Sequence, residues 1–379
     1  MPGFRPTATN GLAARPMRIQ TLKAEQIRLF EQVELEPATG LNWLEGANGA
    51  GKSTLLEAIH VLSCGRSFRG GTHESLIRTG ASQMHVFASV WAEQQQRSVR
   101  LGLERSSRTW SARLDGAAIE PLSRLFQELA VVCFAPDSHV LISGGSESRR
   151  RFIDWALFHV EPRFITPWRR YQRALKQRNS LLKQNPVDAV LGPWERELAE
   201  HGVIVDQLRQ TWLDAFAPDL KVMTEQFLPE LGEVRIRFRP GSEATTTEAM
   251  QEVLLQSRPR ERNLGYTLVG AHRSDWSLGY EHLPERAMFS RGQEKLTVLA
   301  CLLAQALRFS EMRGEWPVLL LDDLPSELDT RHLDATLAWL GAQPVQTFIS
   351  TAQKARPQAE TRREQAVFHV EHGTVARLV

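Results

Sequence analysis

Residues 46–53 read Gly46-Ala47-Asn48-Gly49-Ala50-Gly51-Lys52-Ser53 and fit the pattern G-x-x-x-x-G-K-[ST] of a phosphate-binding loop. Glycines let such a loop curl until several backbone N–H groups point at one phosphate chain. In this pattern Lys52 reaches the β- and γ-phosphates of a nucleotide, and the hydroxyl of Ser53 holds Mg²⁺. The stretch, continued by Thr54, therefore predicts a site for ATP and Mg²⁺.

The residues on both sides of this loop support the prediction. Residues 41–44 have the composition of a short strand, and residues 54–59 form the apolar face of a helix. That helix would direct its positive N-terminal end at the phosphates. The alternative is a glycine-rich turn that matches by chance, and it does not account for strand, loop and helix in this order.

A second stretch supplies a partner for the metal. Residues 318–321 are four apolar residues typical of a buried parallel strand, and Asp322 and Asp323 follow at its carboxyl end. Asp322 would bind Mg²⁺, and Asp323 would orient or deprotonate the attacking water. The alternative, an acidic cap after a core strand, is reasonable only in isolation from the phosphate-binding loop.

About 270 residues separate Lys52 from Asp322, far more than in a simple doubly wound nucleotide-binding fold. Helical periodicity dominates from about residue 147 to 228. We therefore predict an α/β ATPase head whose halves flank an inserted, mainly helical lobe. The predicted segments are a disordered tail or misassigned start at 1–16, the head's first half at 17–147, the lobe at 148–262 and the head's second half at 263–379.

A helix start lies between the lobe and the second acidic stretch. Ser290 would cap this helix, Gly292 leaves room for a phosphate, and Gln293 follows. The motif resembles the signature of ABC-type ATPases, whose serine completes the ATP site of the other protomer. Residues 325–329 resemble the D-loop of the same class.

The full set of motifs resembles the RecF family, the SMC-like ATPases of bacterial recombinational repair. The matching stretches, spread over residues 17–351, are 46–59, 65–69, 149–154, 177–183, 270–275, 290–295 and 322–329. The resemblance implies a head like that of ABC or SMC ATPases with a short lobe in place of a coiled-coil arm. It also implies that ATP drives dimerisation, with two ATP molecules sandwiched between the protomers, and that slow, DNA-stimulated hydrolysis releases the dimer. The resemblance further implies binding to DNA at single-strand gaps and junctions, where such a protein helps RecO and RecR to load RecA.

The chain departs from the family pattern at a few positions. Ala271 replaces the usual proline, and Trp276 replaces the second acid of that motif. Asp323 stands where ABC transporters have glutamate, which favours a weak hydrolase. Ser350, rather than histidine, follows the strand near residue 348, so the sequence does not identify the γ-phosphate sensor. It does not identify a Q-loop glutamine either, since Pro136 stands in roughly that region.

The DNA candidates are basic residues near the loop and in the lobe. Ten basic residues lie between 149 and 183, opposed by two acids. Helical spacing puts Arg169, Arg173 and Lys176 on one face, and either a phosphate-tracking stripe or a solvated helix face fits that pattern. Arg149 and Arg150 are further candidates. Arg66 and Arg69, after the helix of the phosphate-binding loop, are expected to contact either nucleotide or DNA, and Arg28 is a candidate near the nucleotide side. Trp168 and Tyr171 are expected to pack within the lobe rather than stack on bases.

The overall composition limits the classes of protein to which this chain can belong. The chain has 379 residues, a formal net charge of +2 and three widely spaced cysteines, which favours a cytoplasmic protein without a disulfide framework. It has no apolar run of the ~18 residues that a membrane span needs. Two other classes remain as alternatives: the nucleotide-binding subunit of an ABC transporter, and an SMC-like nuclease subunit. The basic lobe argues against the first and its shortness against the second.

Overall fold

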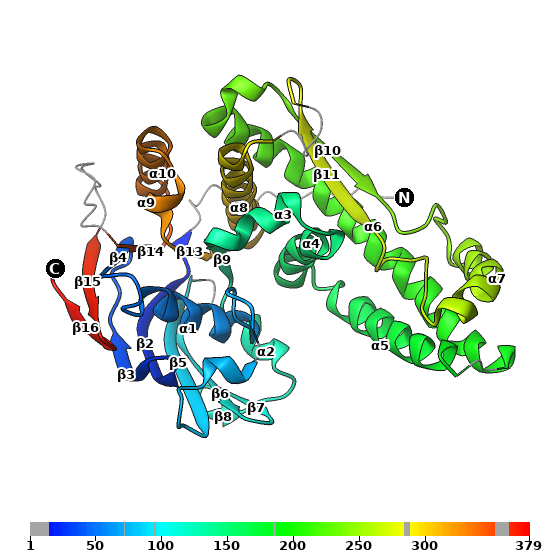
Figure 1. The fold of residues 1–379 in the computed structure, drawn as a ribbon, viewed down its shortest axis with the longest axis horizontal. Helices are drawn as coiled ribbons and strands as arrows, with labels where there is room; N and C mark the ends of the chain where they lie inside the picture. Colours follow the sequence, from blue (N-terminus) through cyan, green and yellow to red (C-terminus); the bar gives the residue numbers. More distant parts are fainter. Residues whose placement is uncertain (1–14, 72, 94–95, 185–186, 284–288, 353–363) are drawn as a thin grey trace. The chain divides into compact units, whose positions relative to one another are not determined.

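The computed structural model describes residues 15–71, 73–93, 96–184, 187–283, 289–352 and 364–379. The chain forms two compact units (Figure 1). The head comprises Met1–Ser138 and Leu299–Val379, and the lobe comprises His139–Val298. The lobe is longer than the expected 148–262 segment because strand β11 (Asp275–Tyr280) pairs with β10 (Val234–Arg239) inside it.

A mainly parallel sheet forms the centre of the head, in the order β16-β15-β4-β14-β13-β9. The strands are β4 (Leu41–Glu45), β9 (Val131–Phe134), β13 (Val318–Leu321), β14 (Thr347–Thr351), β15 (Gln365–Glu371) and β16 (Thr374–Arg377). Only β16 runs antiparallel to its neighbour. All residues of β4, β13 and β14 are buried, as expected for the interior of a parallel sheet.

A second, antiparallel sheet has the order β3-β2-β5-β6-β7-β8. Its strands are β2 (Arg18–Ile27), β3 (Phe30–Leu35), β5 (Gln83–Ala92), β6 (Arg97–Ser106), β7 (Trp110–Leu114) and β8 (Ala117–Ala118). Asp115-Gly116 forms a hairpin turn, since both residues have positive φ and Leu114 pairs with Ala117. Helix α1 (Lys52–Cys64) contacts strands of both sheets.

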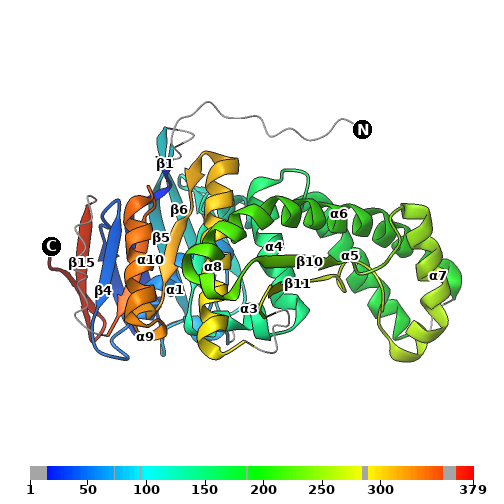
Figure 2. The same cartoon turned by 90° about the horizontal axis from the view of Figure 1, so that it is seen from above.

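Short elements complete the head, which Figure 2 shows from a second side. They are α2 (Ser123–Phe126), β12 (Glu315–Trp316), α9 (Leu324–Glu327), α10 (Thr330–Ala342) and the two-residue strand β1 (Arg15–Pro16). Strand β1 pairs with β12, so the last two residues of the expected 1–16 tail are part of the fold. The rest of that predicted tail lies outside the described residues.

The lobe is helical apart from the β10–β11 ribbon. Its helices are α3 (Val140–Ser143), α4 (Ser146–Val160), α5 (Ile165–Leu182), α6 (Asp188–Phe227) and α7 (Thr247–Leu264), and α8 (Arg291–Arg313) begins in it. Thr246 caps α7, because its side chain accepts a hydrogen bond from Ala249 N. Gly192-Pro193 has the composition of a turn, but it lies inside α6 and does not interrupt the helix.

Candidate nucleotide site

The loop before α1 has the backbone that phosphate binding requires. Gly51 has φ 117°, and a Cβ there would lie 2.7 Å from the Phe30 ring. A Cβ on Gly46 would lie 2.2 Å from Val370 O. Both positions therefore admit only glycine, which keeps the loop tightly curled at the end of β4.

Lys52 is held against this loop. Its Nζ donates to Gly46 O at 2.8 Å and to Ala47 O at 2.9 Å. Burial lowers the pKa of Lys52, and the charges of Asp323 and Asp322 partly offset that effect. The ammonium group thus lies over the loop, where a phosphate chain would approach it.

Asp322 joins the end of β13 to α1. Its Oδ1 accepts hydrogen bonds from Ser53 Oγ at 2.8 Å and from Ser350 Oγ at 2.6 Å. Burial raises the pKa of Asp322, while the two hydroxyl bonds act in the opposite direction. The fold therefore brings the two predicted metal ligands together although 269 residues separate them.

Asp323 has a strained backbone. Its φ is 53°, which is uncommon for a residue other than glycine and concentrates at functional sites. Its N–H donates to Ser350 Oγ at 2.8 Å, and its Oδ1 accepts from Ser326 Oγ at 2.9 Å. These two bonds fix the carboxylate beside Asp322.

A cavity of about 1080 Å³ opens over these groups. Asp322, Asp323 and Ser350 line it, together with the predicted loop residues Asn48, Gly49, Gly51, Lys52, Ser53 and Thr54. The other predicted loop residues, Gly46, Ala47 and Ala50, are not part of the lining, but the carbonyls of Gly46 and Ala47 accept the hydrogen bonds of Lys52. Asp137 also lines the cavity, next to the Pro136 region considered for the Q-loop.

Two of the candidate arginines, Arg28 and Arg69, line this cavity. Arg28 pairs with the fully buried Glu57 of α1 through two hydrogen bonds of 2.9 and 2.7 Å. Ser67 also donates to Glu57. Arg69 lines the cavity, and its charge acts on Asp322. Arg66 is exposed and is absent from the lining.

The residues present fit ATP with Mg²⁺. The glycine cradle and Lys52 suit a phosphate chain, and one hydroxyl with one carboxylate suits Mg²⁺, which usually completes its shell with water and phosphate oxygens. No cluster of three or more His, Cys, Asp or Glu side chains that could hold a metal occurs among the residues described. The site thus suits a metal that arrives with its nucleotide.

The predicted cap of α8 is confirmed. Ser290 Oγ accepts from Gln293 N at 3.3 Å, and Gln293 Oε1 accepts from Ser290 N at 2.9 Å, which is a reciprocal capping box. Ser290 and Gly292 are exposed, and a Cβ on Gly292 would meet nothing within 4 Å. The helix start is therefore open to a second molecule.

Two of the DNA candidates in the lobe have structural roles. Arg149 is 3% exposed and makes a bidentate pair with Asp275, at 2.7 and 2.9 Å. Arg150 is half-buried and donates to Ser146 Oγ and Ser274 O. Assigning Arg149 to DNA is therefore wrong, because its guanidinium is buried, and the guanidinium of Arg150 is held within the lobe.

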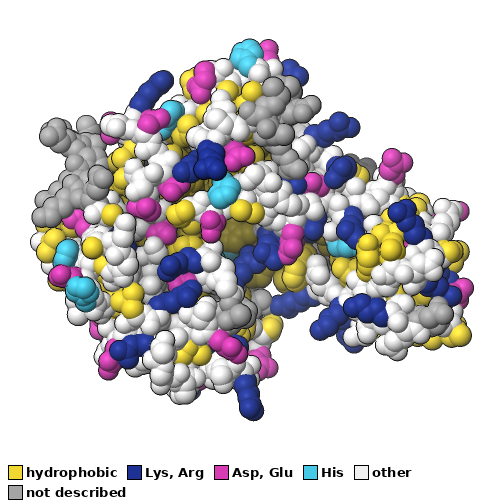
Figure 3. Space-filling model, viewed as in Figure 1, with side chains coloured by type: hydrophobic (Ala, Val, Ile, Leu, Met, Phe, Trp, Pro, Cys, Tyr) yellow, Lys and Arg dark blue, Asp and Glu magenta, His cyan; other side chains and the backbone are white. Residues whose placement is uncertain are grey.

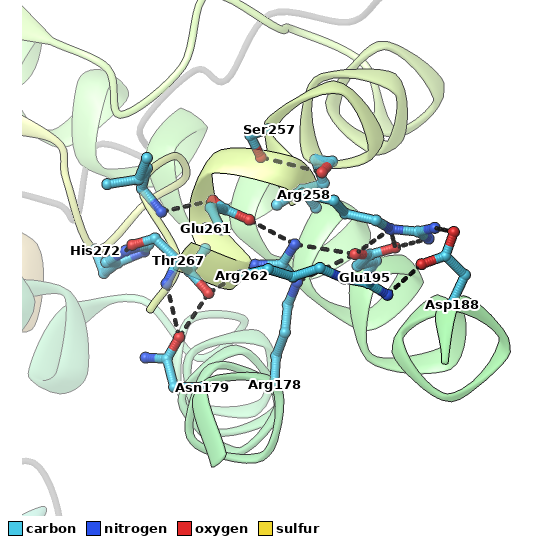
Figure 4. A network of polar contacts seen from close by, with 12 residues as sticks. Arg178, Asn179, Asp188, Glu195, Ser257, Arg258, Glu261, Arg262, Thr267 and His272 are labelled. Carbon is cyan, nitrogen blue, oxygen red and sulfur yellow. Dashed lines mark hydrogen bonds and ion pairs between the residues drawn. The ribbon is translucent and has the colours of Figure 1, made fainter. Parts of the chain in front are cut away.

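Arg178, another of the ten basic residues, belongs to the buried network in Figure 4. It is fully buried and pairs with Glu195 at 3.0 Å and with Glu261 at 2.6 Å. Burial opposes ionisation of Glu195, but hydrogen bonds from Arg258 and Arg178 hold its pKa below the usual range. The network joins α5, α6 and α7.

The α5 stripe, formed by Arg169, Arg173 and Lys176, keeps the expected geometry. All three side chains are exposed, while Tyr171 and Ala174 of the same helix are buried. Figure 3 shows Lys and Arg side chains gathered over this helix. Tyr171 packs in the lobe as expected, and its hydroxyl lies 2.7 Å from His272 Nδ1.

Ser350 has a role that its sequence context does not indicate. Its neighbour strand β13 places it against Asp322, where it bridges both acidic residues. The pairing of Arg28 with Glu57 was also missed. The one available signal was Glu57 itself, a charged residue on the apolar face of α1.

Comparison with known proteins identifies the family. A family model described as the RecF/RecN/SMC N terminal domain matches residues 18–376. The DNA replication and repair protein RecF of Xanthomonas axonopodis pv. citri (strain 306) is 46% identical over 365 residues, covering 95% of this chain and 99% of the relative. This chain belongs to the RecF family. RecF of Stenotrophomonas maltophilia (strain R551-3) is 45% identical over 363 residues, with 95% and 99% coverage.

Solved structures show the same fold. The recombination mediator protein RecF with ATP, of the RecFOR pathway, superposes with a TM-score of 0.88 at 24% identity, covering 98% of this chain and 100% of that one. An Smc head bound to the C-winged helix domain of ScpA gives 0.59 at 14% identity, with 95% and 96% coverage. The predicted α/β head of the RecF and SMC type is therefore confirmed. None of the described helices is long and apolar enough to cross a bilayer.

Proposed function

We propose that this RecF family member is an ATP-dependent DNA-binding protein of recombinational repair and replication restart. The observation that carries the proposal is the convergence of Lys52, Ser53 and Asp322 on one cavity with the strained Asp323. Those groups bind, neutralise and hydrolyse a nucleoside triphosphate. The relatives' names supply the DNA context.

Each residue of the site has a separate role in ATP binding or hydrolysis. The loop N–H groups and Lys52 bind the phosphates, and Ser53 with Asp322 would hold Mg²⁺, which supplies charge neutralisation. Ser350 keeps the Asp322 carboxylate oriented through its 2.6 Å bond. Asp323 accepts the proton of the attacking water. Because aspartate is shorter than glutamate, we expect slow turnover suited to a switch.

Dimerisation would complete the site. The exposed start of α8 offers Ser290, Gly292 and Gln293 to the nucleotide of a second copy. The lobe then presents the α5 stripe to DNA. We propose RecO and RecR as the protein's partners. Together they would load RecA at DNA gaps and junctions in the cytoplasm.

The mass of the protein in solution tests this proposal. Light scattering without nucleotide, with ADP and with ATP plus Mg²⁺, each with and without DNA, should show a dimer only with ATP and a more persistent one with DNA. A monomer under all conditions would contradict the proposed switch.

We expect Ser290→Arg to leave ATP binding intact and to prevent the ATP-dependent dimer. The bulky cation at the open helix start would block the facing nucleotide site, while the protomer's own cavity keeps all its lining residues. Light scattering measures the dimer and a fluorescent ATP analogue measures binding. Arg308→Ala, in the same helix, is the control. A normal dimer in the Ser290 variant would exclude the sandwich arrangement.

We expect Asp323→Asn to slow turnover by about 100-fold or more, as loss of a general base does, and to prolong the ATP-bound dimer. Asparagine keeps the size of the side chain and can still accept the hydrogen bond from Ser326. Phosphate release measures turnover. Asp334→Asn, at an exposed position of α10, is the control, and unchanged turnover in the Asp323 variant would assign the base elsewhere.

A further inference from the structure

Three arginines form an exposed row on β10, which we name the β10 row: Arg235, Arg237 and Arg239. All three are exposed, and the side chain of Arg239 is 77% exposed. The apolar residues that alternate with them are more buried, and the strand contacts α6. Because successive strand residues face opposite sides, the row lies on the outer face of the ribbon.

The partner strand leaves this outer face uncovered. Arg235 pairs in register with Gly279, and Arg237 pairs with Ser277, so the residues opposite them are small. Asp275 is the only acidic residue in β11, and Arg149 already binds both of its oxygens. Arg239 approaches Asp275 only at 3.7 Å. Two further acids, Glu233 and Glu281, lie just beyond the Arg235 end of the ribbon, where Glu233 pairs with Lys221 and also interacts with Arg235. With these acids included, positive charge still exceeds negative charge on this face.

The spacing of the row matches a regular polyanion. Alternate residues of an antiparallel strand are about 6.8 Å apart, since each residue rises about 3.4 Å. Phosphates along one strand of duplex DNA rise about 3.4 Å each along the axis but also turn around it, which places neighbouring phosphates about 7 Å apart, close to the spacing of the row. Arginine also binds phosphate through two parallel N–H groups. The carboxylates of an acidic protein surface have no such regular spacing, so the periodicity of the row favours a nucleic acid backbone.

We infer that Arg235, Arg237 and Arg239 form a binding site for the phosphate backbone of duplex DNA, separate from the α5 stripe. The inference rests on the proposed DNA-binding function and adds a second surface to it. Helix α6 packs against both α5 and β10, and Figure 1 shows these two elements on opposite sides of the lobe. The lobe thus has two basic surfaces.

Salt-dependent binding to a duplex, with ATP present, tests the inference. The test variant changes Arg235, Arg237 and Arg239 to Thr, which removes three charges and keeps a residue suited to strands. The matched control changes Arg100, Arg108 and Arg113 to Thr, three exposed arginines of the head. A third variant changes Arg169, Arg173 and Lys176 to Gln. ATP affinity and the melting temperature verify that each variant is folded.

The row variant should bind duplex DNA about tenfold or more weakly at 0.1 M salt, and its salt slope should fall by about 0.9 for each lost contact. The head control should match the wild type. Unchanged duplex affinity and slope, or a loss equal to that of the control, would overturn the inference, as would a loss seen only with single-stranded DNA. A surface that binds an acidic protein would give the unchanged result. Absence of duplex binding by the wild type would instead refute the proposed function itself.

Discussion

Replacing Lys52 with alanine should weaken ATP binding by at least about a hundredfold. A hydrogen bond to a charged group contributes about 1.5–3 kcal/mol, and Lys52 is placed to reach two phosphates, so the loss is about 3 kcal/mol or more. In the protein as described, Nζ bonds only backbone carbonyls of the loop, at Gly46 and Ala47. A fluorescent ATP analogue measures the affinity.

Lys23→Ala is the matched control, since Lys23 is an exposed lysine of the head, paired with Glu34. Its ATP affinity should equal that of the wild type. Both variants should melt near the wild-type temperature, which separates lost binding from lost folding. Wild-type affinity in the Lys52 variant would refute the phosphate-binding role of the loop.

The sequence predicted those parts of the site whose geometry is local. A strand, a glycine-rich turn and a helix follow one another around Lys52, so their order already fixes the loop. Asp322 could be placed for a similar reason, because a buried strand directly precedes it. Two such local units then needed only nearby positions in one parallel sheet, where β14 alone separates β4 from β13.

The remaining features depend on pairings between distant segments. Ser350 reaches Asp322 because β14 lies beside β13, and strand order cannot be read from either strand alone. Arg149 was a DNA candidate because it lies in a basic run, but its partner Asp275 is 126 residues away. Arg178 is likewise part of the basic run, and its partner Glu261 lies on another helix, α7. A charge run cannot be assigned to solvent or to DNA until its tertiary partners are known.

Replacing Arg178 with methionine should destabilise the lobe by about 3–5 kcal/mol, because the change leaves a carboxylate buried without its cation. Glu261 is fully buried, and its other hydrogen bond is from Leu268 N at 2.6 Å. The loss of Arg178 costs less free energy at Glu195, since Arg258 also pairs with that carboxylate. Urea unfolding followed by tryptophan fluorescence measures the change, at an unchanged dependence on urea concentration.

A second substitution distinguishes an unpaired charge from lost packing. Glu261→Gln added to Arg178→Met removes the stranded charge and keeps an acceptor for Leu268 N, so it should restore most of the lost stability. The control Arg151→Met breaks an exposed pair with Glu147 and should cost less than about 1 kcal/mol. If the double variant is no more stable than Arg178→Met alone, the cost comes from packing. ATP affinity should stay at the wild-type value throughout, because every residue that lines the cavity belongs to the head.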